Sequence, residues 1–104
     1  MPKPEPWRYE KLTWPEINEA VAAQKPVIAP IGSTEQHGPH LPLDVDVVCP
    51  SGVAEAAARH IPDQVLVMHP FVHGYAAHVM DFPGTTNIHW ENFIKCIADI
   101  GASL

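Results

Sequence analysis

The chain has 104 residues, 46% of them apolar, and carries a net charge of −6 from 12 acidic and 6 basic residues. This length allows one domain, and the apolar content is typical of a folded protein. The few Lys and Arg residues argue against nucleic acid as a partner, because phosphate binding needs clustered basic side chains. No apolar stretch predicts a membrane span or a signal peptide, so a cytoplasmic protein is expected, with Cys49 and Cys96 reduced.

The first third of the chain predicts an arm, a helix and a strand. Prolines at positions 2, 4 and 6 oppose a helix, so residues 1–12 are expected to be extended. Thr13 and Glu16 have the spacing of a capping box, which predicts a helix running to about Gln24. Residues 27–31 are continuously apolar, which predicts a strand buried on both faces, although Pro30 removes one ladder donor.

The middle of the chain completes a βαβ unit. Residues 32–43 lack periodicity and are rich in turn formers, which predicts a loop. A helix is expected over residues 47–60, with Pro50 tolerated in its first turn. Residues 65–68 predict a second buried strand, parallel to the first. The helix side chains expected to face inward are Val53, Ala54, Ala57 and Ile61.

The last third predicts a functional loop and an amphipathic helix. The loop over residues 69–88 is long for a compact domain, and such loops are usually functional. Apolar residues at helical spacing from Trp90 to Leu104 predict a helix with no clear stop signal. Two strands and three helices make a poor parallel sheet. An incomplete α/β domain is therefore expected over residues 1–104, with further strands supplied by a missing segment or a second chain.

A cluster of possible metal ligands follows the first strand. Glu35 and His37 lie just past its carboxyl end, where α/β sheets bind ligands, and residues i and i+2 of extended backbone point the same way. Asp46 comes nine residues after His37, across a loop stiffened by Pro39 and Pro42, so the loop can present a third ligand. Two carboxylates and one imidazole suit Zn²⁺, Mn²⁺ or Fe²⁺.

Two interpretations without a metal remain open at this point. Asp46 is also a good N-cap for the helix that follows it. Glu35 and His37 could pair with each other at the surface, since Glu-x-His is a common tripeptide.

Longer strings resemble a known family. Residues 30–43, PIGSTEQHGPHLPL, followed by Asp46, resemble the signature of the creatininase (creatinine amidohydrolase) family. Phe82-Pro83-Gly84-Thr85 resembles the Phe-Pro-Gly-Thr segment of that family. The resemblance implies a metal-dependent hydrolase with a three-layer αβα sandwich and a mainly parallel sheet. It also implies a domain longer than this chain, assembled into a homo-oligomer, commonly a hexamer.

The resemblance also implies roles for the three ligands. Glu35 matches the carboxylate of the first metal, His37 the imidazole of the second, and Asp46 the carboxylate that bridges two ions. The family's further ligands, a His in a later glycine-rich loop and a downstream Glu, have no counterpart in this sequence. Ligand counting agrees, because three side chains cannot hold two ions when one catalytic Zn²⁺ takes three protein ligands.

The second loop supplies the remaining candidates. His40 and His78 are expected to act in acid–base chemistry or in orienting a ligand, and Tyr75 and His78 to contact a small-molecule substrate. Many family members read Y-G-x-S-x-E-H here, whereas Ala76, His78 and Val79 occupy the Ser, Glu and His positions. The expected reaction is hydrolysis of a C–N amide bond, possibly cyclic, in a small polar substrate by metal-activated water. The alternatives are C–C hydrolysis of a cyclic polyol-derived diketone of the inosose type, and a non-catalytic piece that completes a partner chain.

Overall fold

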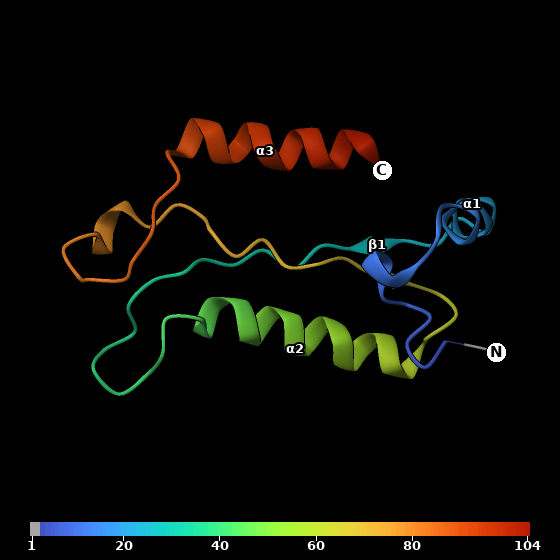
Figure 1. The fold of residues 1–104 in the computed structure, drawn as a ribbon, viewed down its shortest axis with the longest axis horizontal. Helices are drawn as coiled ribbons and strands as arrows, with labels where there is room; N and C mark the ends of the chain where they lie inside the picture. Colours follow the sequence, from blue (N-terminus) through green and yellow to red (C-terminus); the bar gives the residue numbers. More distant parts are fainter. Residues whose placement is uncertain (1–2) are drawn as a thin grey trace. The chain divides into compact units, whose positions relative to one another are not determined.

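The computed structural model describes residues 3–104 and divides the chain into two compact units. Unit 1 consists of Met1–Pro30 and Cys49–Pro70, and unit 2 of Ile31–Val48 and Phe71–Leu104. The regular elements, in chain order, are a 3₁₀ helix (Tyr9–Lys11), α1 (Trp14–Ala22), β1 (Val27–Ile28), α2 (Val45–His60), β2 (Leu66–Val67), a second 3₁₀ helix (Ala77–Val79) and α3 (Trp90–Ser103) (Figure 1).

Both ends of α1 are set by local hydrogen bonds. The predicted capping box is present: Thr13 Oγ1 accepts from the Glu16 backbone N–H, and the Glu16 carboxylate accepts from the Thr13 N–H. The helix ends two residues earlier than predicted because Gln24 adopts a left-handed conformation with φ 55°. The Lys25 N–H then bonds the Ala20 carbonyl in a Schellman motif, which satisfies a helix-end acceptor without glycine.

The strands β1 and β2 confirm the predicted parallel βαβ unit. Val27 pairs with Leu66 and Ile28 with Val67, and α2 lies between the two strands in the sequence. The first strand is shorter than predicted and only half-buried, so the expectation of burial on both faces is wrong for β1. Pro30 interrupts the ladder because it has no N–H.

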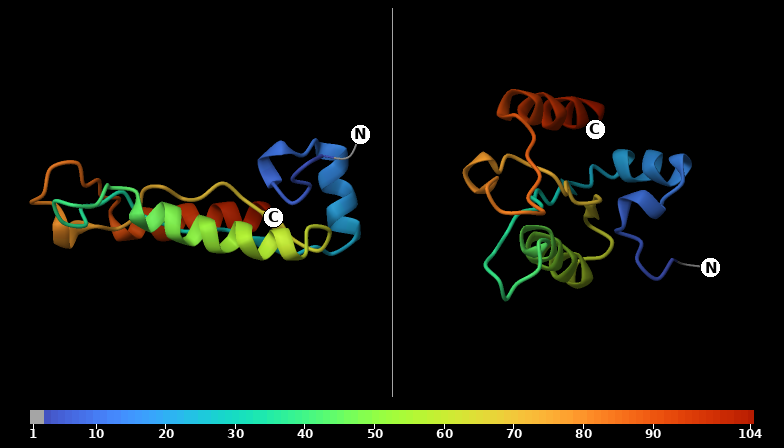
Figure 2. Two further views of the ribbon diagram at one scale, coloured as in Figure 1. Left: turned by 90° about the horizontal axis from the view of Figure 1, so that it is seen from below. Right: turned by 60° about the vertical axis from the view of Figure 1, so that its left-hand side comes forward.

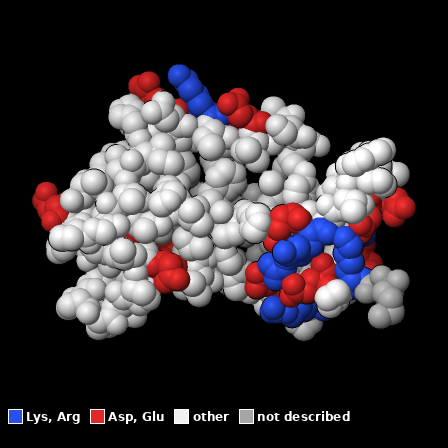
Figure 3. Space-filling view, viewed as in Figure 1, with Lys and Arg blue, Asp and Glu red and all other residues white. Residues whose placement is uncertain are grey.

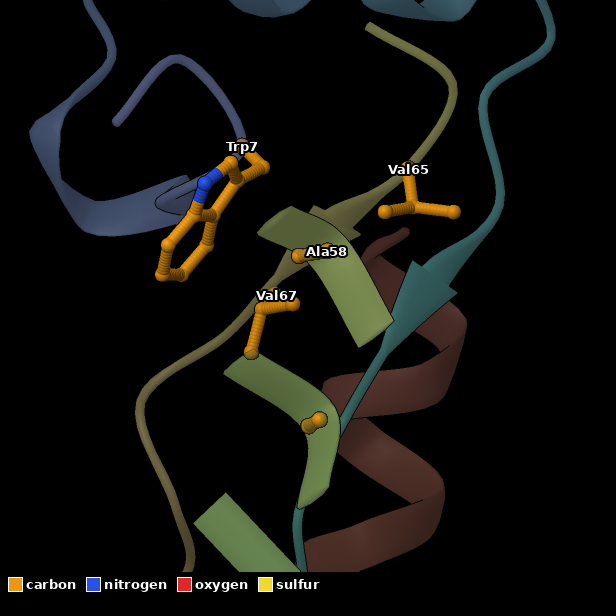
Figure 4. Packing of buried hydrophobic residues seen from close by; sticks show 5 residues of the cluster. Trp7, Ala58, Val65 and Val67 are labelled. Atoms are coloured by element: carbon orange, nitrogen blue, oxygen red, sulfur yellow. The ribbon is translucent and has the colours of Figure 1, made fainter. Parts of the chain in front are cut away.

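A small core forms in unit 1 around Trp7, whose exposed fraction is 2% (Figure 4). Its indole packs with side chains of α2 and β2, and its carbonyl accepts from the Val67 N–H. The prediction of an extended arm over residues 1–12 is therefore wrong for its described part, which also includes a 3₁₀ turn. Burying one large aromatic side chain contributes about 3 kcal/mol, enough to fix this segment in place. Residues 1 and 2 lie outside the described range.

The inward face of α2 differs from the predicted one. Ala54 and Ala58 are buried, whereas Val53 is 73% exposed and Ala57 and Ile61 are exposed as well. Small alanines allow the helix to lie close to Trp7 and β2, so close packing rather than side-chain hydrophobicity selects this face.

The start of α2 also differs from the prediction. The helix begins at Val45 and runs unbroken to His60 (Figure 2), so Asp46 lies inside its first turn and Pro50 lies beyond that turn. The explanation of Asp46 as an N-cap is therefore wrong, because the residue before the helix is Asp44. Pro50 supplies no N–H to the Asp46 carbonyl four residues earlier.

The helix α3 is amphipathic as predicted, yet none of its residues is buried in the part of the chain that the structure describes. Trp90, Ile94 and Leu104 are all more than half exposed. Among residues 3–104, no helix combines the length and the apolar character that crossing a membrane requires.

Candidate metal centre

Two segments of unit 2 run side by side where the predicted ligands begin (Figure 1). Ile31 bridges Phe71 in parallel register, and the Gly32 N–H donates to the Phe71 carbonyl at 2.8 Å. Thr34 Oγ1 donates to the Val72 carbonyl at 2.6 Å. The backbone that carries Glu35 is therefore held by its neighbour up to the residue before it.

The loop after Glu35 folds back on itself, as the sequence predicts. The Glu35 N–H donates to the Leu43 carbonyl at 3.1 Å, which returns the chain to the start of α2. Gly32 permits a close approach here, because a Cβ at this position would overlap the Asp46 backbone carbonyl. Absence of a side chain at Gly32 thus helps to place Asp46 beside Glu35.

The Phe-Pro-Gly-Thr segment supports the same loop from another side. Thr85 is buried, and its Oγ1 accepts from the Gln36 N–H at 3.1 Å, between two predicted ligands. The Thr86 N–H donates to the Thr34 carbonyl at 3.0 Å. Gly84 has φ 93° and packs where a Cβ would come within 2.7 Å of a Leu43 methyl carbon, so only glycine fits. The two family-like strings are therefore parts of one local structure.

Glu35, His37 and Asp46 come together as predicted. One ligand atom from each lies within 4.8 Å of the others, and His37 Nε2 is 3.2 Å from Asp46 Oδ1. His37 Nδ1 lies 3.1 Å from the Glu35 backbone carbonyl. A carbonyl only accepts, so Nδ1 carries the proton and leaves the Nε2 lone pair directed at the cluster, as in many metal-bound histidines. The alternative of a simple Glu35–His37 side-chain pair is not what the geometry shows.

The electrostatics of the cluster are those of negative charge without a compensating cation. The nearby Asp46 carboxylate, and secondly burial, raise the pKa of Glu35 above its ordinary value. The Glu35 backbone carbonyl, followed by the charge of Asp46, raises the pKa of His37 against the opposing effect of desolvation. Over residues 3–104, the ion pairs of Glu35 and Asp46 involve only imidazoles.

One oxygen of the cluster has no hydrogen-bond partner. The Glu35 side chain is 15% exposed, and its Oε2 is buried without a donor among the described residues. A buried carboxylate oxygen left this way costs free energy unless a cation or a donor compensates it. The donor set and the missing counter-charge therefore fit a divalent metal ion.

The other predicted site residues lie at different distances from the cluster. His78 Nε2 is 3.8 Å from Glu35 Oε2. His40 and Tyr75 are exposed, and no hydrogen bond or ion pair among residues 3–104 joins either of them to the three ligands. The sequence reasoning missed the positioning roles of Gly32 and Thr85, although both lie inside the family-like strings.

Comparison with known proteins gives a consistent result for sequence. The family described as "Creatininase: Creatinine amidohydrolase" matches residues 10–104. The chain is 35% identical to creatinine amidohydrolase of Pseudomonas putida, over 86% of this chain and 36% of that protein. It is 39% identical to mycofactocin precursor peptide peptidase of Mycolicibacterium smegmatis, over 74% and 33% respectively. Identity to 3-dehydro-scyllo-inosose hydrolase of Thermotoga maritima is 30%, over 96% and 32%. The chain thus spans about a third of the length of these relatives.

Solved structures give the same result for the fold. A structure described as "Creatininase Mn" superimposes with a TM-score of 0.83 at 33% identity, covering 90% of this chain and 38% of that one. A creatininase variant of "Zn-Zn type" gives 0.81 at 33% identity, covering 89% and 38%. The predicted creatininase-like α/β fold is confirmed.

Proposed function

The chain belongs to the creatininase family, and from that premise we propose that it forms part of a metal-dependent hydrolase whose divalent ions are held by Glu35, His37 and Asp46. The observation that carries the proposal is the buried, unpartnered Glu35 Oε2 in a cluster of two carboxylates and one imidazole. Such oxygen and nitrogen donors suit Zn²⁺, Mn²⁺ or Fe²⁺.

The proposed site holds two ions. Glu35 serves one ion, His37 the other, and Asp46 lies between them as a bridging ligand. Creatininase relatives solved as Mn and Zn-Zn forms support the choice of metals. When bound, such ions lower the pKa of a water and polarise a substrate carbonyl. The chain's own contribution is to hold three donors in place through the bonds from Leu43, Thr85 and the Glu35 carbonyl.

The proposed substrate is a small polar molecule with an amide bond, possibly cyclic. Two of the relatives named above are an amidohydrolase and a peptide peptidase, which favours C–N cleavage. The inosose hydrolase supports a second candidate, C–C hydrolysis of a cyclic diketone. Of the two histidines predicted for acid–base chemistry, His78 is the one beside the cluster, while roles for His40 and Tyr75 stay predictions.

We also propose that residues 1–104 are the N-terminal part of a single creatininase-like domain. A further segment or a second chain would then supply the remaining ligands and cover the exposed face of α3, and the whole would form a homo-oligomer, a hexamer by analogy with the family. The exposed Trp90 and Ile94 support this, since contiguous exposed apolar surface commonly marks an interface.

Metal analysis of the intact protein tests the proposed site. Glu35→Gln, His37→Gln and Asp46→Asn should each reduce bound Zn or Mn strongly, whereas Asp81→Asn, an exposed acid on the second loop, should not. Product analysis on amide substrates and on inosose-type ketones then separates the two reactions. Full metal content and turnover in all three variants would contradict the site, and a folded protein without metal would favour the non-catalytic alternative.

A further inference from the structure

Resting on the proposed function, we propose that His78 is a direct ligand of the ion held by Glu35, through its Nε2 atom. That ion would then have Glu35, Asp46 and His78 as protein ligands, all from this chain. Three protein ligands and an open position are the usual set of a catalytic metal.

The distance between His78 and Glu35 suits two ligands of one ion. Nε2 and Oε2 are 3.8 Å apart, which is too long for a hydrogen bond. Two donors that each lie about 2.1 Å from one ion are separated by about 3 to 4 Å. The observed gap falls inside that range.

The facing oxygen is the one that lacks a partner. Glu35 Oε2 is buried and unpaired in the described residues, and the imidazole nearest to it is that of His78. An ion between the two atoms would compensate the oxygen and bind the ring nitrogen at the same time. A mere ion pair would leave the oxygen 3.8 Å from its counter-charge.

The position of His78 also fits a site with two ions. The atoms of Glu35, His37 and Asp46 lie within 4.8 Å of one another, and His78 is not part of that group. Paired catalytic ions are about 3.5–4 Å apart. A ligand of the first ion alone is therefore expected to lie beside Glu35 and farther from the His37 side.

The turn that carries His78 is anchored independently of its side chain. His78 is 67% exposed in the 3₁₀ helix Ala77–Val79. Ala76, just before it, is fully buried, and its N–H donates to Asn87 Oδ1 at 2.7 Å. Replacing His78 should consequently leave the fold intact.

Cobalt titration of the intact protein tests the assignment with His78→Gln and His78→Cys. The glutamine variant should bind Co²⁺ at least about 10-fold more weakly, since even residues that only orient a ligand contribute that much. The cysteine variant should add a sulfur-to-cobalt charge-transfer band absent from the unaltered protein, in which Cys49 and Cys96 are also present. His60→Cys, at the exposed end of α2, is the matched control and should add no band.

The outcomes separate a ligand from a neighbour. Unchanged affinity in His78→Gln overturns the proposal, and so does weakened affinity without the sulfur band in His78→Cys, because His78 would then act through Glu35. If the unaltered protein binds no cobalt, the proposed function fails together with this ligand.

Discussion

The two units each contain a cluster of carboxylates, and the clusters are balanced in opposite ways. In unit 1, the Arg8 guanidinium donates to Glu5 at 2.7 Å and to Glu55 at 3.1 Å. The hydrogen bond from Arg8 lowers the pKa of Glu5. In unit 2, the neighbouring Asp46 raises the pKa of Glu35. The first cluster thus contains its own cation, and the second lacks one.

The distribution of basic residues underlies this difference. Five of the six Lys and Arg residues belong to unit 1, and Lys95 is the sole one in unit 2, which has six acids. Figure 3 shows blue and red side chains interleaved over the N-terminal segment. Negative charge in unit 1 is consequently structural, whereas that around Glu35 is available for a metal ion. Each prediction below tests one side of this contrast.

The largest expected effect is on metal affinity after Asp46→Asn. The change keeps the size of the side chain but removes the charge that both ions would share, so affinity for Zn²⁺ should fall by more than about 100-fold, beyond the loss typical of residues that only orient a ligand. Competition with a coloured chelator measures it. The matched control Asp81→Asn should bind like the unaltered protein, and equal affinity for both variants would place the metal elsewhere.

A change at Arg8 should affect stability and leave the metal alone. Arg8→Met leaves Glu5 and Glu55 without their donor, and the free energy of unfolding should fall by about 1–3 kcal/mol. Urea denaturation of the intact protein provides the measurement, with the exposed Lys11→Met as control. A simultaneous loss of metal affinity would show that the two clusters are not independent.

A smaller effect is expected from Thr85→Val. The variant keeps the shape of the side chain but leaves the Gln36 N–H without its acceptor, which should loosen the loop between Glu35 and His37. Metal affinity should fall about 10-fold, the lower end for residues that support a ligand. Thr85→Ser retains the hydroxyl and should restore most of the affinity; failure of serine to do so would argue against the hydrogen bond as the cause.

The smallest effect is a shift in the titration of His37 in metal-free protein. Its pKa should lie above the ordinary 6.5, chiefly because the Glu35 carbonyl accepts its proton. The stability it contributes is then fully present below about pH 6.5 and is lost as pH rises through the raised value. NMR titration of the imidazole checks this, and Asp46→Asn should bring the pKa part of the way back. A His37 that titrates like the exposed His60 would contradict the described geometry.

Local patterns in the sequence predicted the features that depend on neighbouring residues. The Thr13 capping box and the convergence of Glu35, His37 and Asp46 follow from spacing and from a stiffened loop, and both are present. The burial of Trp7 and the inward face of α2 depend on contacts between distant segments. No periodicity could indicate that Ala54 rather than Val53 would face the core.

The same limit applies to the site. The closeness of His78 to Glu35 and the support from Thr85 join residues more than forty positions apart. Their identities were visible within the second loop, but their place beside the first loop depends on how the two segments pair. Sequence spacing could therefore identify the ligands that share one loop and not the residues that complete or support the site from another.

The central claim is that Glu35, His37 and Asp46 hold a divalent ion, and anomalous diffraction from crystals of the intact protein grown with Zn²⁺ tests it most directly. The account predicts an anomalous peak about 2.0–2.2 Å from a carboxylate oxygen of Glu35, from His37 Nε2 or from an oxygen of Asp46, with all three side chains directed at the metal. Zinc bound only at other residues, with these three turned away from one another, would contradict it.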